Sequence, residues 1–242
     1  MPALYLLDIE GTTSPISFVY NVLFPYARER MSDYILRHSD DPALQADLRL
    51  LAQENAIDRA SGAPIIYFPQ SLSQDPAKAL EASISYLLWL MNQDRKSTAL
   101  KSVQGKIWAE GYEQGELYGE AFPDVPPALE RWHRTTQVAI YSSGSVEAQR
   151  YIFAYARGGD LTPFIDAYFD TRTGPKVESE SYCKIAEAMN TDSADVLFIS
   201  DSIKELGAAR DAGLNTLLSL RPGNPAIPDH HGHRAISSFD EV

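Results

Sequence analysis

Four short apolar runs, each followed at once by polar or turn-forming residues, mark this chain. They are Ala3–Leu7, Gln137–Tyr141, Val196–Ile199 and Thr216–Leu220. Continuous apolar runs of this length are typical of strands that are buried on both faces of a parallel sheet. Amphipathic stretches at helical spacing, Tyr182–Met189 and Asp201–Gly213, lie between the later runs. Strands that alternate with helices predict right-handed crossovers and an α/β fold with a doubly wound, Rossmann-like parallel sheet.

The segment 14–122 breaks this alternation, because its apolar positions follow a helical spacing with no convincing buried strand between them. Asp75 and Pro76 are typical of an N-cap and the first position of a helix. Apolar stripes at helical spacing begin at Phe18, Leu44, Leu80 and Leu100. A helical insert directly after the first strand predicts a cap on an α/β core. We therefore expect a catalytic core of residues 1–13 and 123–242 and a helical cap domain of residues 14–122.

Charge and composition narrow the range of partners. The chain has 242 residues, with 33 Asp and Glu against 21 Lys and Arg and a formal charge of -12. Such a field repels the phosphates of nucleic acid and of anionic lipids, so neither is an expected partner. No apolar stretch approaches the roughly 20 residues that cross a bilayer, and the first apolar run is too short for a signal peptide. We expect a cytoplasmic protein and, since no pattern demands a second chain, a monomer.

The single cysteine and the histidines limit the kinds of metal site. Cys183 has no partner for an internal disulfide or a paired-cysteine zinc site, which favours a reducing compartment and a metal held by oxygen or imidazole. The segment Asp229–His233 contains three histidines. A polar run flanked by prolines is more typical of a loop than of a metal site, so we predict a loop here.

Polar residues of the kind that handle phosphate or metal follow three of the predicted strands. They are Asp8, the pair Ser142 and Ser143, and Asp201. The carboxyl ends of parallel strands meet at one edge of an open sheet, where ligands of such folds bind. Asp and Ser are also common in helix caps and turns, so each residue taken alone has a structural explanation. The coincidence of three favours a functional site.

Asp8 and Glu10 stand two positions apart as the chain leaves the first strand. Alternate residues of a strand face the same side, so both carboxylates can address one ligand. Two like charges that close require a cation between them or a raised pKa. Mg²⁺ takes hard oxygen ligands and leaves positions open for phosphate and water. Asp201, from another strand, would supply a further oxygen.

These residues resemble the four motifs of the haloacid dehalogenase superfamily of phosphatases, which form an aspartyl phosphate. The run Asp8–Thr12, DIEGT, is similar to the first motif, usually DxDGT. Ser142 or Ser143 matches the second motif, Lys176 the third, and Asp201 in the run SDSIKE the fourth. The motifs occur in the expected order with a helical insert after the first. The resemblance implies a haloacid dehalogenase core with an inserted helical cap.

The glutamate at position 10 sharpens the resemblance. The runs Asp8–Val19 and Leu23–Arg28 look like the enolase-phosphatase family of methionine salvage, also called acireductone synthase, and the resemblance extends over essentially the whole chain. It implies a bifunctional enzyme with one Mg²⁺ per monomer. Such an enzyme enolises 2,3-diketo-5-methylthiopentyl-1-phosphate and then dephosphorylates it to the acireductone 1,2-dihydroxy-3-keto-5-methylthiopentene.

The resemblance, together with the requirements of phosphoryl transfer, implies a role for each of these residues. Asp8 is the expected nucleophile, and Glu10 the acid that protonates the leaving oxygen and the base that later activates water. Lys176 is expected to be catalytic and to bind the phosphoryl group. Ser142 and Ser143 are the expected substrate-binding pair. The expected metal ligands are Asp8, Asp201 and Glu10, the last through its side chain or its backbone carbonyl.

The sequence alone leaves three further roles open. Glu205, one helical turn after Asp201, orients Lys176 or a metal-bound water, or it serves the helix dipole. The enolisation base is Glu10 or a cap residue, and Phe18 or Tyr20 is a candidate for contact with the methylthio tail.

Two other functions are alternatives to the enolase-phosphatase hypothesis. One is a magnesium-dependent phosphatase of the same superfamily with another small phosphate ester as its substrate. The other is a phospho-aspartate signalling domain, which carries acidic residues and a lysine at similar strand ends. The large cap and the Glu10 base argue against signalling, because a signalling domain benefits from a long-lived phosphoaspartate.

Overall fold

The computed structural model describes residues 1–62 and 75–242. The chain divides into two compact units, one of residues 1–21 and 114–242 and the other of residues 22–113. In the described part of the chain no helix is long and apolar enough to cross a membrane.

The first unit is built on a six-stranded parallel sheet with the order β3-β2-β1-β4-β5-β6. The strands are β1 (Leu4–Leu7), β2 (Gln137–Tyr141), β3 (Ala167–Phe169), β4 (Val196–Ser200), β5 (Asn215–Ser219) and β6 (Arg234–Ile236). Strand β1 lies between β2 and β4, and Leu7 is aligned with Ile140 and Ile199. The residues that follow these three strands therefore emerge together at one edge of the sheet.

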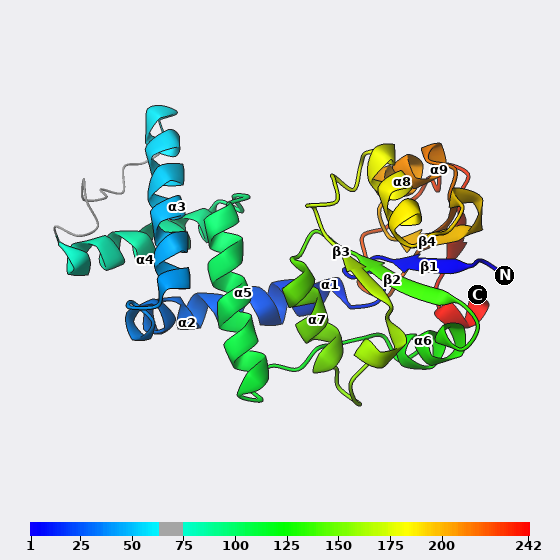
Figure 1. The fold of residues 1–242 in the computed structure, drawn as a ribbon, viewed down its shortest axis with the longest axis horizontal. Helices are drawn as coiled ribbons and strands as arrows, with labels where there is room; N and C mark the ends of the chain where they lie inside the picture. Colours follow the sequence, from blue (N-terminus) through cyan, green and yellow to red (C-terminus); the bar gives the residue numbers. More distant parts are fainter. Residues whose placement is uncertain (63–74) are drawn as a thin grey trace. The chain divides into compact units, whose positions relative to one another are not determined.

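Helices cover both faces of this sheet (Figure 1). Helices α6 (Val125–His133) and α7 (Val146–Ala154) pack on one face, while α8 (Ser179–Ala188) and α9 (Ile203–Asp211) pack on the other. Along β1, Tyr5 and Leu7 join the first of these cores, and Leu4 and Leu6 join the second. A strand whose two faces are both buried has to be apolar throughout, which is why β1 reads as a continuous apolar run.

The predicted doubly wound parallel sheet is confirmed, but the sequence pattern missed β3 and β6. Each has only three residues and lies at an edge of the sheet. None of the residues of β3 is fully buried, and Arg234 of β6 is exposed. Such strands lack the apolar run that marked the other four. Short 3₁₀ helices, η2 (Thr162–Phe164), η3 (Ser193–Asp195) and η4 (Phe239–Glu241), complete the unit.

The second unit is helical in its described residues. The chain enters it through α1 (Ile16–Phe18) and the π-helix η1 (Val19–Leu23), and its helices are α2 (Phe24–Arg37), α3 (Pro42–Ala60), α4 (Pro76–Asn92) and α5 (Thr98–Glu113). As predicted, Asp75 caps α4, and its side chain accepts a hydrogen bond from the backbone N–H of Lys78. The stripes that begin at Leu44, Leu80 and Leu100 pack into one core.

The segment Asp229–His233 forms a loop in which His233 is buried. The His233 Nδ1 lies 2.7 Å from the hydroxyl of Thr216 on β5. Within the described residues, no group of three or more His, Cys, Asp or Glu side chains is placed to hold a metal ion.

A buried ion pair holds the C-terminal segment to the core. The Arg221 Nη1 donates to Asp124 Oδ2 at 2.7 Å and to the Ser237 carbonyl at 2.9 Å, and the Phe239 N–H also donates to Asp124 Oδ2. Burial works to raise the pKa of Asp124, but the Phe239 N–H and the Arg221 charge outweigh it and lower that pKa below its ordinary value. The pair therefore stabilises the fold above pH ~4, and this contribution is lost as the pH falls through the lowered pKa.

We predict that Asp124→Asn lowers the free energy of unfolding at pH 7 by about 3 kcal/mol, because it leaves the Arg221 charge buried without its partner. The deficit should begin to narrow below pH ~4, where Asp124 of the unfolded wild type takes up a proton, and should vanish once the pH falls below the lowered pKa of the folded state. Denaturant unfolding at several pH values measures it. The control Glu130→Gln, which breaks the exposed Glu130–Arg134 pair, should have little effect. Equal stability of Asp124→Asn and wild type at pH 7 would contradict the prediction.

Candidate active site

The chain turns sharply directly after β1, and this turn fixes Asp8 at the edge of the sheet. The Asp8 N–H donates to the Ile199 carbonyl at 3.0 Å, and the Asp8 Oδ1 accepts from the N–H of Ile9 at 2.8 Å. The Ile9 carbonyl then accepts the N–H groups of residues 12, 13 and 14. Asp8 is therefore both buried and tightly held.

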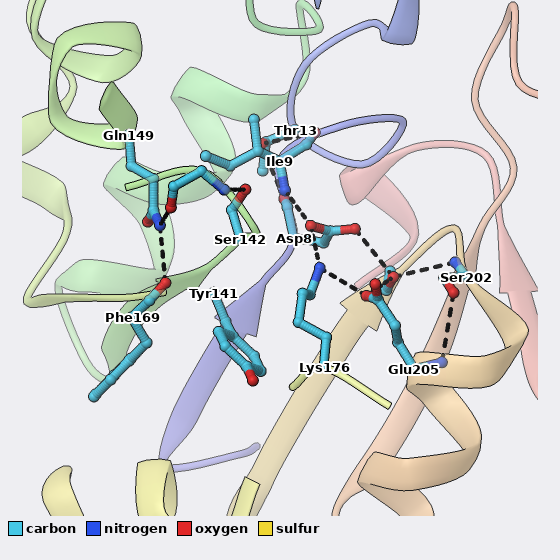
Figure 2. A network of polar contacts seen from close by, with 12 residues as sticks. Asp8, Ile9, Thr13, Tyr141, Ser142, Gln149, Phe169, Lys176, Ser202 and Glu205 are labelled. Atoms are coloured by element: carbon cyan, nitrogen blue, oxygen red, sulfur yellow. Dashed lines mark hydrogen bonds and ion pairs between the residues drawn. The ribbon is translucent and has the colours of Figure 1, made fainter. Parts of the chain in front are cut away.

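A buried ammonium group joins two carboxylates beside this turn (Figure 2). The Lys176 Nζ lies 2.6 Å from Asp8 Oδ1 and 2.7 Å from Glu205 Oε2, and Lys176 is only 7% exposed. Its backbone carbonyl accepts from the Tyr182 hydroxyl at 2.7 Å, and the Tyr141 ring lies 5.6 Å from the Nζ. Burial works against the charged form, but Asp8 and Glu205 outweigh it and raise the pKa of Lys176. Lys176 therefore stays protonated.

Glu205 stands in the first turn of α9, where Ser202 caps the helix. The Ser200 hydroxyl lies 3.1 Å from Asp8 Oδ2 and 3.0 Å from Glu205 Oε2, so its one proton serves one carboxylate at a time. Burial and the nearby Asp8 raise the pKa of Glu205 to about 7. Glu205 thus contacts Lys176 directly, which was one of the roles left open by the sequence.

Asp201 lies against the backbone of the turn after β1. A Cβ atom placed on Gly11 would approach Asp201 Oδ2 to 2.3 Å, and the φ of Gly11 is +70°. Only glycine fits this position without strain, because it has no Cβ atom and adopts a positive φ readily. Burial, followed by the charges of Asp8 and Glu205, raises the pKa of Asp201 to about 7, and Glu10 adds to the shift. Asp201 is therefore a partly buried carboxylate with other negative charges close by.

Ser142 and Ser143 follow β2, the strand next to β1. Ser142 is buried, and its hydroxyl accepts from the Gly144 N–H at 3.3 Å, whereas Ser143 is exposed. The Gln149 side-chain amide donates to the carbonyls of Gly144 and Phe169 and so holds this loop at the start of α7 (Figure 2). Backbone N–H groups at a helix start suit an anion.

The structure thus places the predicted site residues at one edge of the sheet. Asp8 and Lys176 are in direct contact, and Asp201 lies against the turn between Asp8 and residue 12. Glu10 is exposed on that turn, and its charge acts on Asp201. Ser142 and Ser143 reach the same edge from the neighbouring strand.

Sequence reasoning missed three residues that shape the site. The Ser200 hydroxyl contacts two carboxylates, and the Tyr141 ring lies near the Lys176 ammonium. The Asn224 amide donates to the backbone carbonyl of Gly11. Ser200 and Tyr141 are the last residues of β4 and β2, so their position at the sheet edge was a usable signal. Asn224 lies in a loop after β5 and carries no such signal.

The residues at this edge fit a hard divalent cation by their chemistry. Their donors are carboxylate oxygens, and burial first, then the charges of Asp8 and Glu205, raises the pKa of Asp201 although Lys176 works in the opposite direction. A bound divalent cation would stabilise the ionised carboxylates and lower that pKa. Because no three acidic side chains of the described residues are placed around one metal position, Asp8 and Asp201 would hold the cation through their carboxylates and Glu10 through its carboxylate or its main-chain carbonyl.

Comparison with known proteins shows the family. A model of haloacid dehalogenase-like hydrolases matches residues 2–213. The chain belongs to this family. It is 49% identical to an enolase-phosphatase E1 from Synechococcus elongatus over 98% of this chain and 96% of that protein. It is 41% identical to the enolase-phosphatase E1 of Danio rerio over 98% of this chain and 93% of that one.

A solved structure agrees with this assignment. The crystal structure of the UTR4 protein from Saccharomyces cerevisiae is similar with a TM-score of 0.80 and 33% identity, and all of both chains is covered. The resemblance drawn from the DIEGT run is therefore confirmed, and the chain is a haloacid dehalogenase-like hydrolase with the α/β fold of that family.

The crowding of carboxylates in this hydrolase has a measurable effect on stability. Between pH ~4 and pH ~7, folded Asp201 keeps a proton that the unfolded chain has lost, so the free energy of unfolding falls as the pH rises. We predict that Asp201→Asn stabilises the metal-free protein at pH 8 by about 2 kcal/mol, and by almost nothing at pH 4.

Thermal unfolding in the presence of a chelator at both pH values measures this difference. The exposed Asp192, whose side chain caps no helix, offers a matched control, and Asp192→Asn should change little. A variant Asp201→Asn that is less stable than wild type at pH 8 would show that the carboxylates do not repel one another as described.

Proposed function

We propose that this chain is a magnesium-dependent enolase-phosphatase of methionine salvage. It would convert 2,3-diketo-5-methylthiopentyl-1-phosphate and water, through the enol, to 1,2-dihydroxy-3-keto-5-methylthiopentene and phosphate. The observation that carries the choice of substrate is the 49% identity, over 98% of the chain, to a protein named enolase-phosphatase E1. The contact of Lys176 with Asp8 supports the chemistry.

The proposed metal is one Mg²⁺, held by Asp8, Asp201 and Glu10, the last through its carboxylate or its main-chain carbonyl. When bound, it would neutralise phosphoryl oxygens and polarise the substrate carbonyl as a Lewis acid. The remaining chemistry belongs to the side chains. Lys176, fixed by Glu205 and Asp8, supplies a positive charge to the transferring group, and this interaction strengthens as charge develops there.

Enolisation leaves the composition of the substrate unchanged, because one proton moves from C1 to the C2 carbonyl oxygen. In the next step an Asp8 carboxylate oxygen attacks phosphorus, and the bond between phosphorus and the C1 oxygen breaks. Glu10 protonates the departing oxygen. Ser142 and Ser143 would donate hydroxyl hydrogen bonds to the substrate from the adjacent strand.

The second half-reaction releases phosphate. Glu10, now a carboxylate, takes a proton from a water molecule that attacks phosphorus. The bond between phosphorus and the Asp8 oxygen breaks, and Asp8 is regenerated. The exposure of Glu10 on the turn suits a residue that exchanges protons with solvent and substrate. The cytoplasmic location, the monomeric state and the absence of nucleic-acid partners remain predictions from composition.

A substrate panel tests the proposal. We expect phosphate release from the diketo phosphate together with the ultraviolet absorption of an acireductone, both lost with a chelator and restored by Mg²⁺. Turnover of glycolate or sugar phosphates without enolisation of the diketo phosphate would instead indicate another phosphatase of the same family. A stable phosphoprotein without turnover would favour a signalling domain.

We predict that Asp8→Asn lowers the rate of phosphate release by a factor of about 10³ or more, because an amide is a poor nucleophile toward phosphorus. Single-turnover phosphate assays measure the rate, and circular dichroism checks that the variant is folded. Asp192→Asn, at an exposed position, should retain the wild-type rate. Unchanged phosphate release by folded Asp8→Asn would remove Asp8 from the nucleophile role.

A further inference from the structure

The loop that follows β5 supports the turn after β1 from the opposite end of the chain. The Gly11 carbonyl accepts hydrogen bonds from the Ser219 hydroxyl at 3.1 Å and from the Asn224 side-chain amide at 2.9 Å. The Arg221 Nε donates to the next carbonyl, that of Thr12, at 3.0 Å. The last residue of β5 and two side chains of the loop after it thus hold two successive carbonyls of the turn that carries Glu10.

Asn224 differs from the other two because its amide also faces Asp201. The Asn224 Nδ2 lies 3.5 Å from Asp201 Oδ2, a long hydrogen bond. Both neighbours of this nitrogen, the Gly11 carbonyl and the Asp201 carboxylate, are acceptors, so the NH₂ group has to face them. Within the described residues the buried Asn224 Oδ1 has no partner, so the two nitrogen contacts determine how the amide is oriented.

The Asp201 carboxylate and the Asn224 amide both lie close against the Gly11 backbone, on the side where a side chain at position 11 would stand. A Cβ atom placed on Gly11 would approach Asp201 Oδ2 to 2.3 Å and Asn224 Nδ2 to 2.9 Å. The Asn224 N–H donates to the Arg221 carbonyl at 3.1 Å, so the loop itself is closed by a turn. The amide thus lies between the Gly11 carbonyl and the Asp201 carboxylate and contacts both.

We propose that Asn224 is a positioning residue that fixes the Asp201 carboxylate relative to the turn holding Asp8 and Glu10. It thereby sets the affinity of this edge for a divalent cation. The inference rests on the proposed function, because that function places the cation at these carboxylates. Asn224 acts through Gly11 and Asp201 and is assigned no contact with the substrate. One N–H of the amide faces the Asp201 carboxylate while the other binds the Gly11 carbonyl, so the amide ties the carboxylate to the turn and leaves its negative charge available to the cation.

Removal of a residue that orients a metal ligand typically lowers metal affinity 10-fold to 100-fold. We therefore expect Asn224→Ala to raise the dissociation constant for Mn²⁺, used as a probe in place of Mg²⁺, by about 10-fold or more. Titration of the metal-free full-length chain with Mn²⁺ alone, followed by electron paramagnetic resonance, measures binding without any dependence on turnover.

Asn215→Ala provides the matched control. The Asn215 side-chain amide also donates to a backbone carbonyl, that of Ala194, but at an exposed position at the start of β5. Both variants lose an amide hydrogen bond, so their melting temperatures should fall by similar small amounts. Only Asn224→Ala should lose Mn²⁺ affinity. If Asn224→Ala does not fold, Asn224→Ser, which keeps one donor at this position, is titrated instead and should show the same direction of change.

The outcomes separate the two proposals. If wild type binds Mn²⁺ and releases phosphate, but the dissociation constant of Asn224→Ala stays within about twofold of it, the positioning role of Asn224 is wrong and the proposed function stands. If Asn215→Ala loses as much Mn²⁺ affinity as Asn224→Ala, the effect is a general loss of stability and the positioning role is again wrong. If wild type binds no Mn²⁺, the proposed metal site fails, and with it the inference.

Discussion

Carboxylates crowd one edge of a buried sheet, with a single buried ammonium group among them, and the rest of the site follows from this constraint. Lys176 bridges Asp8 and Glu205 at 2.6 Å and 2.7 Å. It cannot also neutralise Asp201, whose pKa rises to about 7. Ionised side chains are rarely buried without a partner. The structure therefore holds an excess of negative charge that suits a cation and a phosphoryl group arriving together.

This explains how an acidic protein can bind an anionic substrate. The formal charge of -12 gives no long-range attraction for a phosphate ester. Attraction has to come from short-range features at the sheet edge. Those features are the Lys176 ammonium, the N–H groups at the start of α7 and the cation that the carboxylates would hold. Each acts over a few ångströms, where burial strengthens electrostatic interactions.

The fold places these groups by holding one tight turn from several directions. The turn after β1 is fixed internally by the Ile9 carbonyl, and from outside by Ser219, Arg221 and Asn224. Arg221 also binds Asp124 and the C-terminal segment. Arg221 thus contributes both to the attachment of the C-terminal segment and to the geometry of the site, whereas the side-chain amide of Asn224 contacts Gly11 and Asp201.

Much of this arrangement was predictable from the sequence, because it depends on local patterns. Strands buried on both faces are apolar throughout, so β1, β2, β4 and β5 were found, and the polar residues after β1, β2 and β4 marked the site edge. Lys176 was identified only through the family resemblance, because its loop carries no periodic signal. The position of Ser200 at the end of β4 was a usable signal, but Asn224 lies in a loop whose contact with Gly11 depends on tertiary packing, so no local pattern reveals it. The edge strands β3 and β6 were missed because each has only three residues, too few of them buried and apolar to make a recognisable run.

The proposed reaction depends most directly on Asp8, which Lys176 holds in place, acting as the nucleophile. Acid quench of the enzyme during turnover of the diketo phosphate, followed by peptide mass spectrometry, tests this. We predict that the mass of one phosphoryl group appears on the peptide that contains Asp8, and that it is absent in Asp8→Asn. A phosphoryl group on another residue, or turnover with no phosphorylated protein even when the quench precedes product release, would contradict the account.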